Sequence, residues 1–210
     1  MKTFAVGVSG ATGIVLACRL VEVLLAGGHS IHLCVSRAAK LVIEEELPAR
    51  TPGQRGVIPG LVHDRLHEWG ERDFRAPFAS GSTAIAGMAI VPCSMSTVGA
   101  IANGIADNLI RRGAEVMLKE RKPLVVVPRE APLSEIHLEN LLRVARAGGI
   151  VIPPQLCFYQ RPGPDVAEQI DFNVSRVLDH LGVENRLYRR WDEPGAVVTS
   201  TPTCEAEDRV

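Results

Sequence analysis

Hydroxyl and charged side chains follow two short apolar runs near the middle of the chain. The runs are Met88 to Val91 and Leu124 to Val127, and their β-branched composition predicts two buried strands that each stop at a proline. The polar residues beyond them are Cys93, Ser94, Ser96 and Thr97 after the first run, and Arg129 and Glu130 after the second. Ligands of open α/β sheets bind outside the carboxyl ends of the strands. The segment from residue 92 to residue 132 is therefore expected to form half of a binding site.

A glycine turn near the N-terminus offers a second place where an anion could bind. The segment Ser9-Gly10-Ala11-Thr12-Gly13 stands between an apolar run, Phe4 to Val8, and an apolar helix expected from about Ile14 to Leu25. Glycines let the backbone approach a phosphate, and the N–H groups at the start of a helix favour an anion. The same glycines would also serve a plain tight turn, so the spacing alone leaves phosphate binding open.

The spacing of glycines in this turn and the residues after the next strand indicate which kind of nucleotide could bind. Gly7-x-x-Gly10-x-x-Gly13 departs from the G-x-G-x-x-G fingerprint of dinucleotide sites. The strand expected from Ile31 to Val35 is followed by Ser36 and Arg37, where an NAD site would place an acid for the ribose hydroxyls. A mononucleotide with a terminal phosphate fits better, although Arg37 keeps NADP open.

A later helix, expected from Asp107 to about Lys122, carries two cations with competing interpretations. Arg112 and Lys119 lie seven residues apart and so on the same side of that helix, where they could bind an anion together. The alternative is a surface ion pair between Glu115 and Lys119, which would stabilise the helix by about 0.3 kcal/mol.

Two further polar features have simple structural alternatives. Glu44, Glu45 and Glu46 close a helix expected from Ala38 to Leu47. Three consecutive helical residues spread over most of a turn, so at least one of these side chains is expected to point inward, the alternative being a solvated face. Ser94 could bind a ligand, or it could simply cap the helix that follows it.

Strands and helices alternate along the whole chain. The remaining elements are expected to be a short strand or helix near Val62 to Trp69 within an irregular segment, a helix from Ser134 to Ala147, a strand from Ile150 to Ile152 with Tyr159 beyond it, and a helix from about Pro164 to Leu181 that carries Arg176. This alternation predicts a single α/β domain over residues 1–192, a three-layer Rossmann-like or flavodoxin-like fold with a doubly wound, mainly parallel sheet. Residues 193–210 are expected to form a flexible tail.

The composition argues against several classes of function. Lysine and arginine number 23 against 24 acidic residues, so no overall field favours nucleic acid or an anionic membrane. No apolar run approaches ~18 residues, and the N-terminus lacks the pattern of a signal peptide. The five cysteines show neither CxxC nor metal-ligand spacing. We therefore expect a cytoplasmic protein that binds a small ligand and needs no metal.

Ten short motifs occur in an order that closely resembles the UbiX-type flavin prenyltransferases. They are Gly10-Ala-Thr-Gly13, Ser36-Arg-Ala-Ala39, Ser80-Gly-Ser82, Pro92-Cys-Ser94, Asn108-Leu-Ile-x-Arg112, Leu118-Lys-Glu-Arg121, Pro128-Arg-Glu-Ala-Pro132, His137-Leu-Glu-Asn140, Phe158-Tyr159 and Arg190-Trp191. The resemblance spans Thr3 to Trp191, and the block from Leu118 to Pro132 is its most specific part.

The resemblance implies transfer of the dimethylallyl group of dimethylallyl monophosphate to N5 and C6 of reduced FMN, which gives prenylated FMN for UbiD-type decarboxylases. It also implies a homo-oligomer, typically of twelve subunits, with sites at subunit interfaces. By the same resemblance FMN would contact Gly10, Ala11, Thr12, Ser36, Ser94, Met95, Ser96, Thr97 and Arg129. The prenyl phosphate would contact Arg112, Lys119, Tyr159 and Arg176, and the catalytic residues would be Glu46, Lys119, Glu130 and Trp191.

These residue types suit allylic chemistry. Breaking an allylic C–O bond leaves negative charge on the phosphate, which Arg112, Lys119, Arg129 and Arg176 could meet. The positive charge on carbon would be stabilised by the flavin face and by the rings of Tyr159 and Trp191. A monophosphate does not call for Mg²⁺. Glu46 or Glu130 would move a proton during ring closure, and the sequence leaves the choice between them open.

Some positions depart from the family pattern. Thr12 stands in place of a commoner serine, Gly113 and Glu115 in place of alanine and aspartate, and Phe74 where some relatives have tryptophan. These changes leave every expected phosphate ligand and both candidate acids in place.

Two other functions remain open at this stage. An FMN-dependent decarboxylase with the same fold would call for a histidine near the first helix, and no histidine lies between Gly10 and Ala26. A non-catalytic FMN carrier would need only one phosphate site, so Lys119 and Arg176 would be dispensable.

Overall fold

The computed structural model describes residues 1–47, 56–159 and 163–191 of the chain. Within them six strands form one sheet in the order β3-β2-β1-β4-β5-β6, and every neighbouring pair is parallel. The strands are β1 (Thr3–Val8), β2 (Ser30–Val35), β3 (Leu66–Trp69), β4 (Gly87–Cys93), β5 (Leu124–Pro128) and β6 (Ile150–Val151). The α/β prediction is confirmed, and the strand order is that of the Rossmann fold rather than of flavodoxin.

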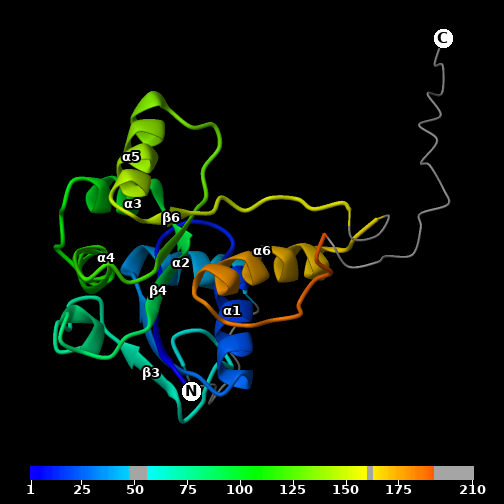
Figure 1. The fold of residues 1–210 in the computed structure, drawn as a ribbon, viewed down its shortest axis with the longest axis horizontal. Coiled ribbons are helices and arrows are strands. Elements are labelled where there is room, and N and C mark those ends of the chain that lie inside the picture. The colour runs from blue at the N-terminus through cyan, green and yellow to red at the C-terminus, as the bar shows by residue number, and fades with distance from the viewer. Residues whose placement is uncertain (48–55, 160–162, 192–210) are drawn as a thin grey trace.

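Helices cover both faces of this sheet and make the three expected layers. They are α1 (Ile14–Ala26), α2 (Arg37–Glu46), α3 (Met95–Ala102), α4 (Leu109–Lys119), α5 (Glu135–Arg146) and α6 (Val166–His180), with a short 3₁₀ turn η1 (Pro77–Ala79). In Figure 1, α1 and α6 lie together on one side of the sheet, and α3, α4 and α5 lie on the other. The buried side chains of α2 belong to the α1 and α6 layer.

β1 runs through the middle of the core and is buried on both faces. Phe4, Val6 and Val8 pack into the layer of α1 and α6, whereas Ala5 packs into the layer of α3 and α4. All four side chains are fully buried. Successive side chains of a strand point to opposite faces, so a strand covered on both sides is apolar at every position. Burying one such large side chain contributes about 1.5–3 kcal/mol.

Several element boundaries differ from those expected, and two of them have a clear physical reason. β4 continues through Pro92 to Cys93 instead of stopping at the proline, and its register with β5 shifts between Ile90 and Cys93. This irregularity accommodates a residue that has no N–H to donate. α4 begins at Leu109 rather than at Asp107, because the side chain of Asn108 accepts the N–H of Arg111 at 3.0 Å and caps the helix.

The irregular region before β4 contains the single short strand that the sequence allowed. β3 lies at the edge of the sheet and pairs with β2. Residues 48–55 and the expected tail, 193–210, lie outside the described residues. In the part of the chain that is described, no helix has the length and apolar character needed to cross a bilayer.

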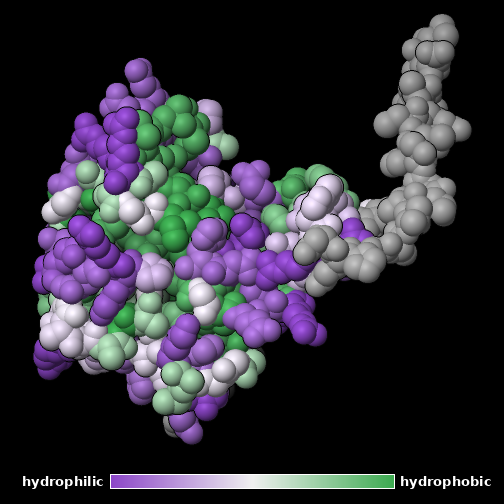
Figure 2. Space-filling model, in the orientation of Figure 1, coloured by the Kyte–Doolittle hydropathy of each residue, from purple (hydrophilic) through white to green (hydrophobic). Residues whose placement is uncertain are grey.

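α5 packs on α3 at the rim of the domain and exposes apolar side chains. Val144 is its one buried residue, whereas Ile136 and Leu138 are 69% and 54% exposed. Figure 2 shows apolar surface around α5 and on the adjoining face of the molecule. Leu156 and Phe158, in the segment after β6, are also exposed. An apolar surface of this kind favours contact with another protein surface.

Packing at η1 explains the glycine at position 113 of α4, where the family resemblance led us to expect alanine. A Cβ atom built on Gly113 would lie 2.6 Å from Cδ2 of Phe78 and 2.9 Å from Sδ of Met88. The ring of Phe78 is fully buried and therefore occupies the space that an alanine methyl would need. The next residue of η1, Ala79, accepts a hydrogen bond from Nε of Arg112 at 3.1 Å, so this packing also positions a predicted site residue.

We predict that Gly113→Ala lowers the free energy of unfolding by about 1 kcal/mol. Overpacking against Phe78 costs about 1–3 kcal/mol, and the gain in helix propensity, about 1 kcal/mol, offsets part of this. Urea unfolding of four proteins, wild type, Gly113→Ala, Phe78→Leu and the double variant, measures the coupling. In the Phe78→Leu background the alanine should become neutral or stabilising. An equal effect in both backgrounds would show that Phe78 is not the cause.

Candidate functional site

A cleft of about 510 Å³ opens at the carboxyl ends of four neighbouring strands. Its lining consists of Ser9 and Gly10 after β1, Ser36, Arg37, Ala38 and Leu41 after β2, Glu71 after β3, Ser94, Ser96 and Thr97 after β4, and Asn108 and Arg111 at the start of α4. The strand order reverses between β1 and β4, and α/β sheets bind ligands at such a switch point. We call this space the switch-point cleft.

Three helices begin at the switch-point cleft, and the N-cap residue of each lines it. Ser36 accepts the N–H of Ala39 at 3.1 Å and caps α2. Ser94 accepts the N–H of Thr97 at 3.4 Å and caps α3, and Asn108 caps α4. The N-terminus of a helix carries partial positive charge and unpaired N–H groups. Because the carboxylate of Glu71 already accepts the first N–H of α2, the starts of α3 and α4 are the ends that favour an anionic group in the cleft.

Hydroxyl groups form the floor of the cleft between β1 and β4. The N–H of Ser94 donates to Oγ of Ser9 at 2.8 Å, and Oγ of Ser94 lies 3.1 Å from Oγ1 of Thr97 and 3.2 Å from Oγ of Ser96. Ser94 therefore caps a helix and lines the cleft at once, so its two interpretations are compatible. Hydroxyls can both donate and accept, which suits a ligand with phosphate or sugar oxygens.

Gly10 leaves room for the start of α2. A Cβ atom at Gly10 would lie 2.5 Å from Cβ of Ala38, closer than two such atoms can approach. Glycine at this position thus lets the turn after β1 and the first turn of α2 share one wall of the cleft. This steric requirement is separate from the contact with a phosphate that the sequence suggested.

Two N–H groups at the end of the glycine turn, those of Gly13 and Ile14, are bound by a carboxylate of the chain itself. Oε2 of Glu46 accepts the N–H of Gly13 at 3.0 Å and the N–H of Ile14 at 2.8 Å. Glu46 is the last residue of α2, and it supplies the cap that α1 lacks at Gly13. It is also the inward-pointing member expected among the three glutamates. Ala11 and Thr12, the other predicted residues of the turn, do not belong to the lining of the switch-point cleft.

Arg112 and Lys119 reach the same short segment, from Ala79 at the end of η1 to Gly81, which confirms that they share one side of α4. Nε of Arg112 donates to the carbonyl of Ala79 at 3.1 Å, and a Cβ atom at Gly81 would lie 2.8 Å from Nζ of Lys119. The alternative ion pair between Glu115 and Lys119 is wrong. Glu115 instead pairs with Arg112 at 2.7 Å, and Lys119 pairs with Glu120. Glutamate, one methylene longer than the usual aspartate, spans the distance to Arg112.

The other predicted substrate residues lie in the layer of α6. The ring of Tyr159 meets that of Trp191 edge to face at 5.1 Å, and Arg176 pairs with Asp179 at 2.9 Å. Burial and a hydrogen bond involving Cys157 raise the pKa of Tyr159 to about 12, so the phenol keeps its proton at neutral pH. α4 packs in the opposite layer. One chain thus places the four predicted substrate residues on two sides of its sheet.

Arg129 and Glu130 lie just beyond β5, and both are exposed. The N–H of Arg129 donates to the carbonyl of Cys93 at 3.2 Å, which joins the ends of β4 and β5. Oε1 of Glu130 accepts the N–H of Ala131 at 3.1 Å. Met95, the first residue of α3, is buried. None of these three side chains belongs to the lining of the switch-point cleft.

The cleft also contains residues that the sequence analysis did not assign to a site. They are Ser9, Arg37, Ala38, Leu41, Glu71, Asn108 and Arg111. Ser9 follows a predicted strand, and Asn108 lies near the start of a predicted helix. The sequence pattern could therefore have assigned both residues to the site. The pattern could not have assigned Glu71 and Arg111 to the site, because their placement depends on how β3 ends and on how α4 is rotated.

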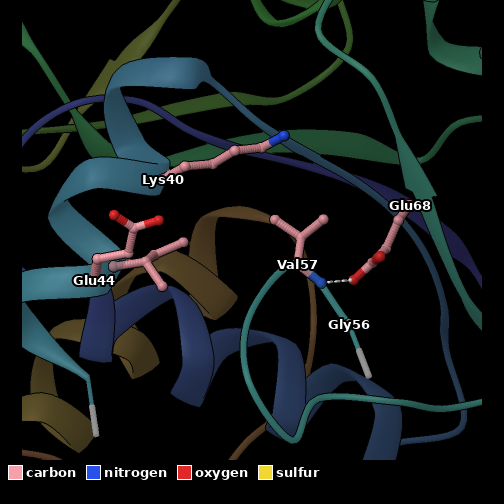
Figure 3. A pocket seen from close by; sticks show the side chains of 6 residues that line it. Lys40, Glu44, Gly56, Val57 and Glu68 are labelled. Carbon is pink, nitrogen blue, oxygen red and sulfur yellow. Dashed lines mark hydrogen bonds between the residues drawn. The ribbon is translucent and has the colours of Figure 1, made fainter. Parts of the chain in front are cut away.

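A second hollow of about 290 Å³ lies between α2 and β3 and differs in chemistry. Figure 3 shows Lys40 and Glu44 on one side of it and Val57 and Glu68 on the other, with the N–H of Val57 donating to Glu68 at 2.7 Å. No predicted site residue lines this hollow. Among the residues that the structure describes, no group of three or more His, Cys, Asp or Glu could hold a metal ion.

A Rossmann-type sheet with an anion-favouring cleft at its switch point defines a nucleotide-binding domain, and residues 1–175 match the family described as Flavoprotein. The flavin prenyltransferase UbiX of Aquifex aeolicus is 44% identical over 193 residues, which cover 91% of this chain and 99% of that protein. The chain belongs to the UbiX flavin prenyltransferase family.

Two solved structures are similar over nearly the whole chain. AnUbiX (PadA1), in complex with FMN and dimethylallyl pyrophosphate, has a TM-score of 0.82 and 38% identity, and the match covers 92% of this chain and 99% of AnUbiX. A dodecameric FMN-dependent UbiX-like decarboxylase from Escherichia coli O157:H7 has a TM-score of 0.81 and 39% identity, with 91% and 100% of the chains covered.

We predict that Glu46→Gln lowers the free energy of unfolding by about 1–2 kcal/mol. The substitution removes the negative charge at the N-terminus of α1 and weakens two charge-assisted hydrogen bonds. Chemical denaturation measures the loss. Glu45→Gln is the matched control, because Glu45 is its exposed neighbour on the same helix, and it should change stability by less than about 0.5 kcal/mol. Equal stabilities of the two variants would exclude the capping role of Glu46.

Proposed function

We propose that this protein joins the dimethylallyl group of dimethylallyl monophosphate to N5 and C6 of reduced FMN. The product, prenylated FMN, would serve a UbiD-type decarboxylase. The observation that carries this proposal is AnUbiX, which is 38% identical over almost the same length and was solved with FMN and dimethylallyl pyrophosphate. The cysteine pattern of the sequence adds the expectation that the enzyme works in the cytoplasm.

The switch-point cleft is the proposed site of FMN. Its hydroxyls and the N-termini of α3 and α4 suit a phosphate and a ribityl chain. Gly10, Ser36, Ser94, Ser96 and Thr97 line it, and the family resemblance adds Ala11, Thr12, Met95 and Arg129 around it. Bound reduced FMN supplies the two nucleophilic positions. The residues of the chain hold and orient it.

The prenyl phosphate is proposed to lie between neighbouring copies of the chain. Arg112 and Lys119 belong to the layer of α4, whereas Tyr159, Arg176 and Trp191 lie with α6 on the other side of the sheet. A phosphate that contacts both groups would therefore take them from two subunits. The apolar surface at α5 offers a surface for such assembly, and we propose a homododecamer like the Escherichia coli relative.

In this arrangement the cations neutralise the charge that develops on the leaving phosphate. The rings of Tyr159 and Trp191, which meet at 5.1 Å, stabilise the allylic carbon cation. Glu46 is a carboxylate fixed beside the glycine turn, and Glu130 is exposed after β5. Both keep the proposed role of general acid or base during ring closure.

A flavin-dependent decarboxylase is the second candidate, because the Escherichia coli relative is described as an FMN-dependent decarboxylase. Against it, the segment from Gly10 to Ala26 contains no histidine to act in the cleft. An FMN carrier without catalysis is the third candidate, and it would leave the pair of cations on α4 without a function.

We predict that the purified protein converts reduced FMN to a heavier flavin under anaerobic conditions. Incubation with dimethylallyl monophosphate should raise the flavin mass by one dimethylallyl group less a proton, as measured by mass spectrometry. Dimethylallyl pyrophosphate is tested in parallel, since AnUbiX was solved with it. An unchanged flavin mass with both donors would refute the prenyltransferase proposal.

We also predict that Lys119→Ala abolishes prenyl transfer while FMN binding persists. The ammonium group of Lys119 lies beside Gly81 and outside the lining of the switch-point cleft, so its loss should affect the donor phosphate alone. Product formation and FMN affinity are measured on the same preparation. Lys40→Ala, a change of the same charge on α2, should retain both. Loss of FMN binding in Lys119→Ala would show that the lysine has been assigned to the wrong ligand.

A further inference from the structure

Arg111, which lines the switch-point cleft, carries a buried nitrogen without a hydrogen-bond partner. Among the described residues, three buried side-chain nitrogens are unpartnered, Nε of Arg65, Arg111 and Arg189, and of these residues Arg111 alone lines the cleft. A buried donor without a partner lowers the stability of the folded protein by about 1–3 kcal/mol. Such a group is therefore expected to form a hydrogen bond when a ligand is bound. Because Arg111 also lines the switch-point cleft, its side chain is a candidate to bind a ligand there.

An ion pair with Asp107 holds the guanidinium of Arg111 in place and uses one of its three nitrogens. Nη1 donates to both oxygens of Asp107, at 2.7 and 2.9 Å. The side chain of Asp107 is 60% exposed, whereas that of Arg111 is 19% exposed. An exposed partner of this kind contributes little and is screened by water. A guanidinium has five N–H donors, so the pair with Asp107 leaves donors for a second anion.

One carboxylate of the cleft already occupies the start of α2. At the start of α2, Oε2 of Glu71 already accepts the N–H of Arg37 at 2.5 Å. A phosphate would be repelled by that carboxylate. The starts of α3 and α4 are capped by the neutral side chains of Ser94 and Asn108, so no carboxylate caps either of them. Arg111 lies in the first turn of α4.

We propose that Arg111 binds the phosphate of FMN and thereby selects FMN over riboflavin. This inference rests on the proposed FMN site and extends it to a residue that the family resemblance does not supply. The motif Asn108-Leu-Ile-x-Arg112 leaves position 111 unspecified. The contact is therefore a property of this chain, in addition to the phosphate contacts of its hydroxyls and helix ends.

The test compares the affinities of FMN and riboflavin for wild type, Arg111→Gln and Arg146→Gln by calorimetric titration. Charge-assisted hydrogen bonds to a phosphate predict that Arg111→Gln weakens FMN binding about 10- to 100-fold. Riboflavin, which has no phosphate, should lose less than about threefold. Arg146→Gln is the matched control, because this exposed arginine in the last turn of α5 lies outside the cleft.

Equal losses for the two flavins, or an unchanged FMN affinity, would overturn the inference. If Arg111→Gln fails to fold, Arg111→Lys keeps the charge and most of the stem, and it must still lose more affinity for FMN than for riboflavin. Because the assay measures binding alone, it is independent of prenyl transfer. A protein that binds FMN through Arg111 but forms no prenylated product would refute the proposed function and support this contact.

Discussion

The parallel pairing of β1 with β4 is the constraint on which the site depends. Residues Phe4 to Gly7 pair in register with Gly87 to Ile90. This pairing brings Ser9 and Ser94 together although they are 85 residues apart in the sequence, and the N–H of Ser94 donates to Oγ of Ser9 at 2.8 Å. The turns after the two strands become the floor of one cleft because the chain leaves β1 and β4 toward opposite faces of the sheet. Every other contact of the cleft is built around this floor.

The helix ends around that floor are not equivalent, because carboxylates of the chain already bind two of them. Glu46 accepts the N–H groups at the start of α1, and Glu71 accepts the first N–H of α2. The starts of α3 and α4 have only neutral caps, Ser94 and Asn108. The net charge of the chain is −1, so the attraction of an anion must arise from this local pattern rather than from the protein as a whole.

Much of the fold followed from the sequence, because apolar runs and helix caps are local signals. The strands, their parallel pairing and the position of Ser36 and Ser94 after strand ends were all predictable. The extent of β4 was not, since the effect of Pro92 depends on its neighbour β5. The role of Glu46 as the cap of α1, the partner of Glu115 and the contribution of Glu71 to the cleft depend on how separate elements pack. The residue pattern of a single helix or strand does not predict contacts between separate elements.

The same sheet that creates the switch-point cleft also separates the proposed donor residues. α4, with Arg112 and Lys119, packs on one face, and α6, with Arg176, packs on the other. A single chain can therefore complete the flavin half of the proposed site, whose lining comes from contiguous strand ends. The proposed donor half would take residues from both layers, and a second copy of the chain would bring them together. Assembly and catalysis would then be linked, because the two groups of proposed donor residues would meet across a subunit interface.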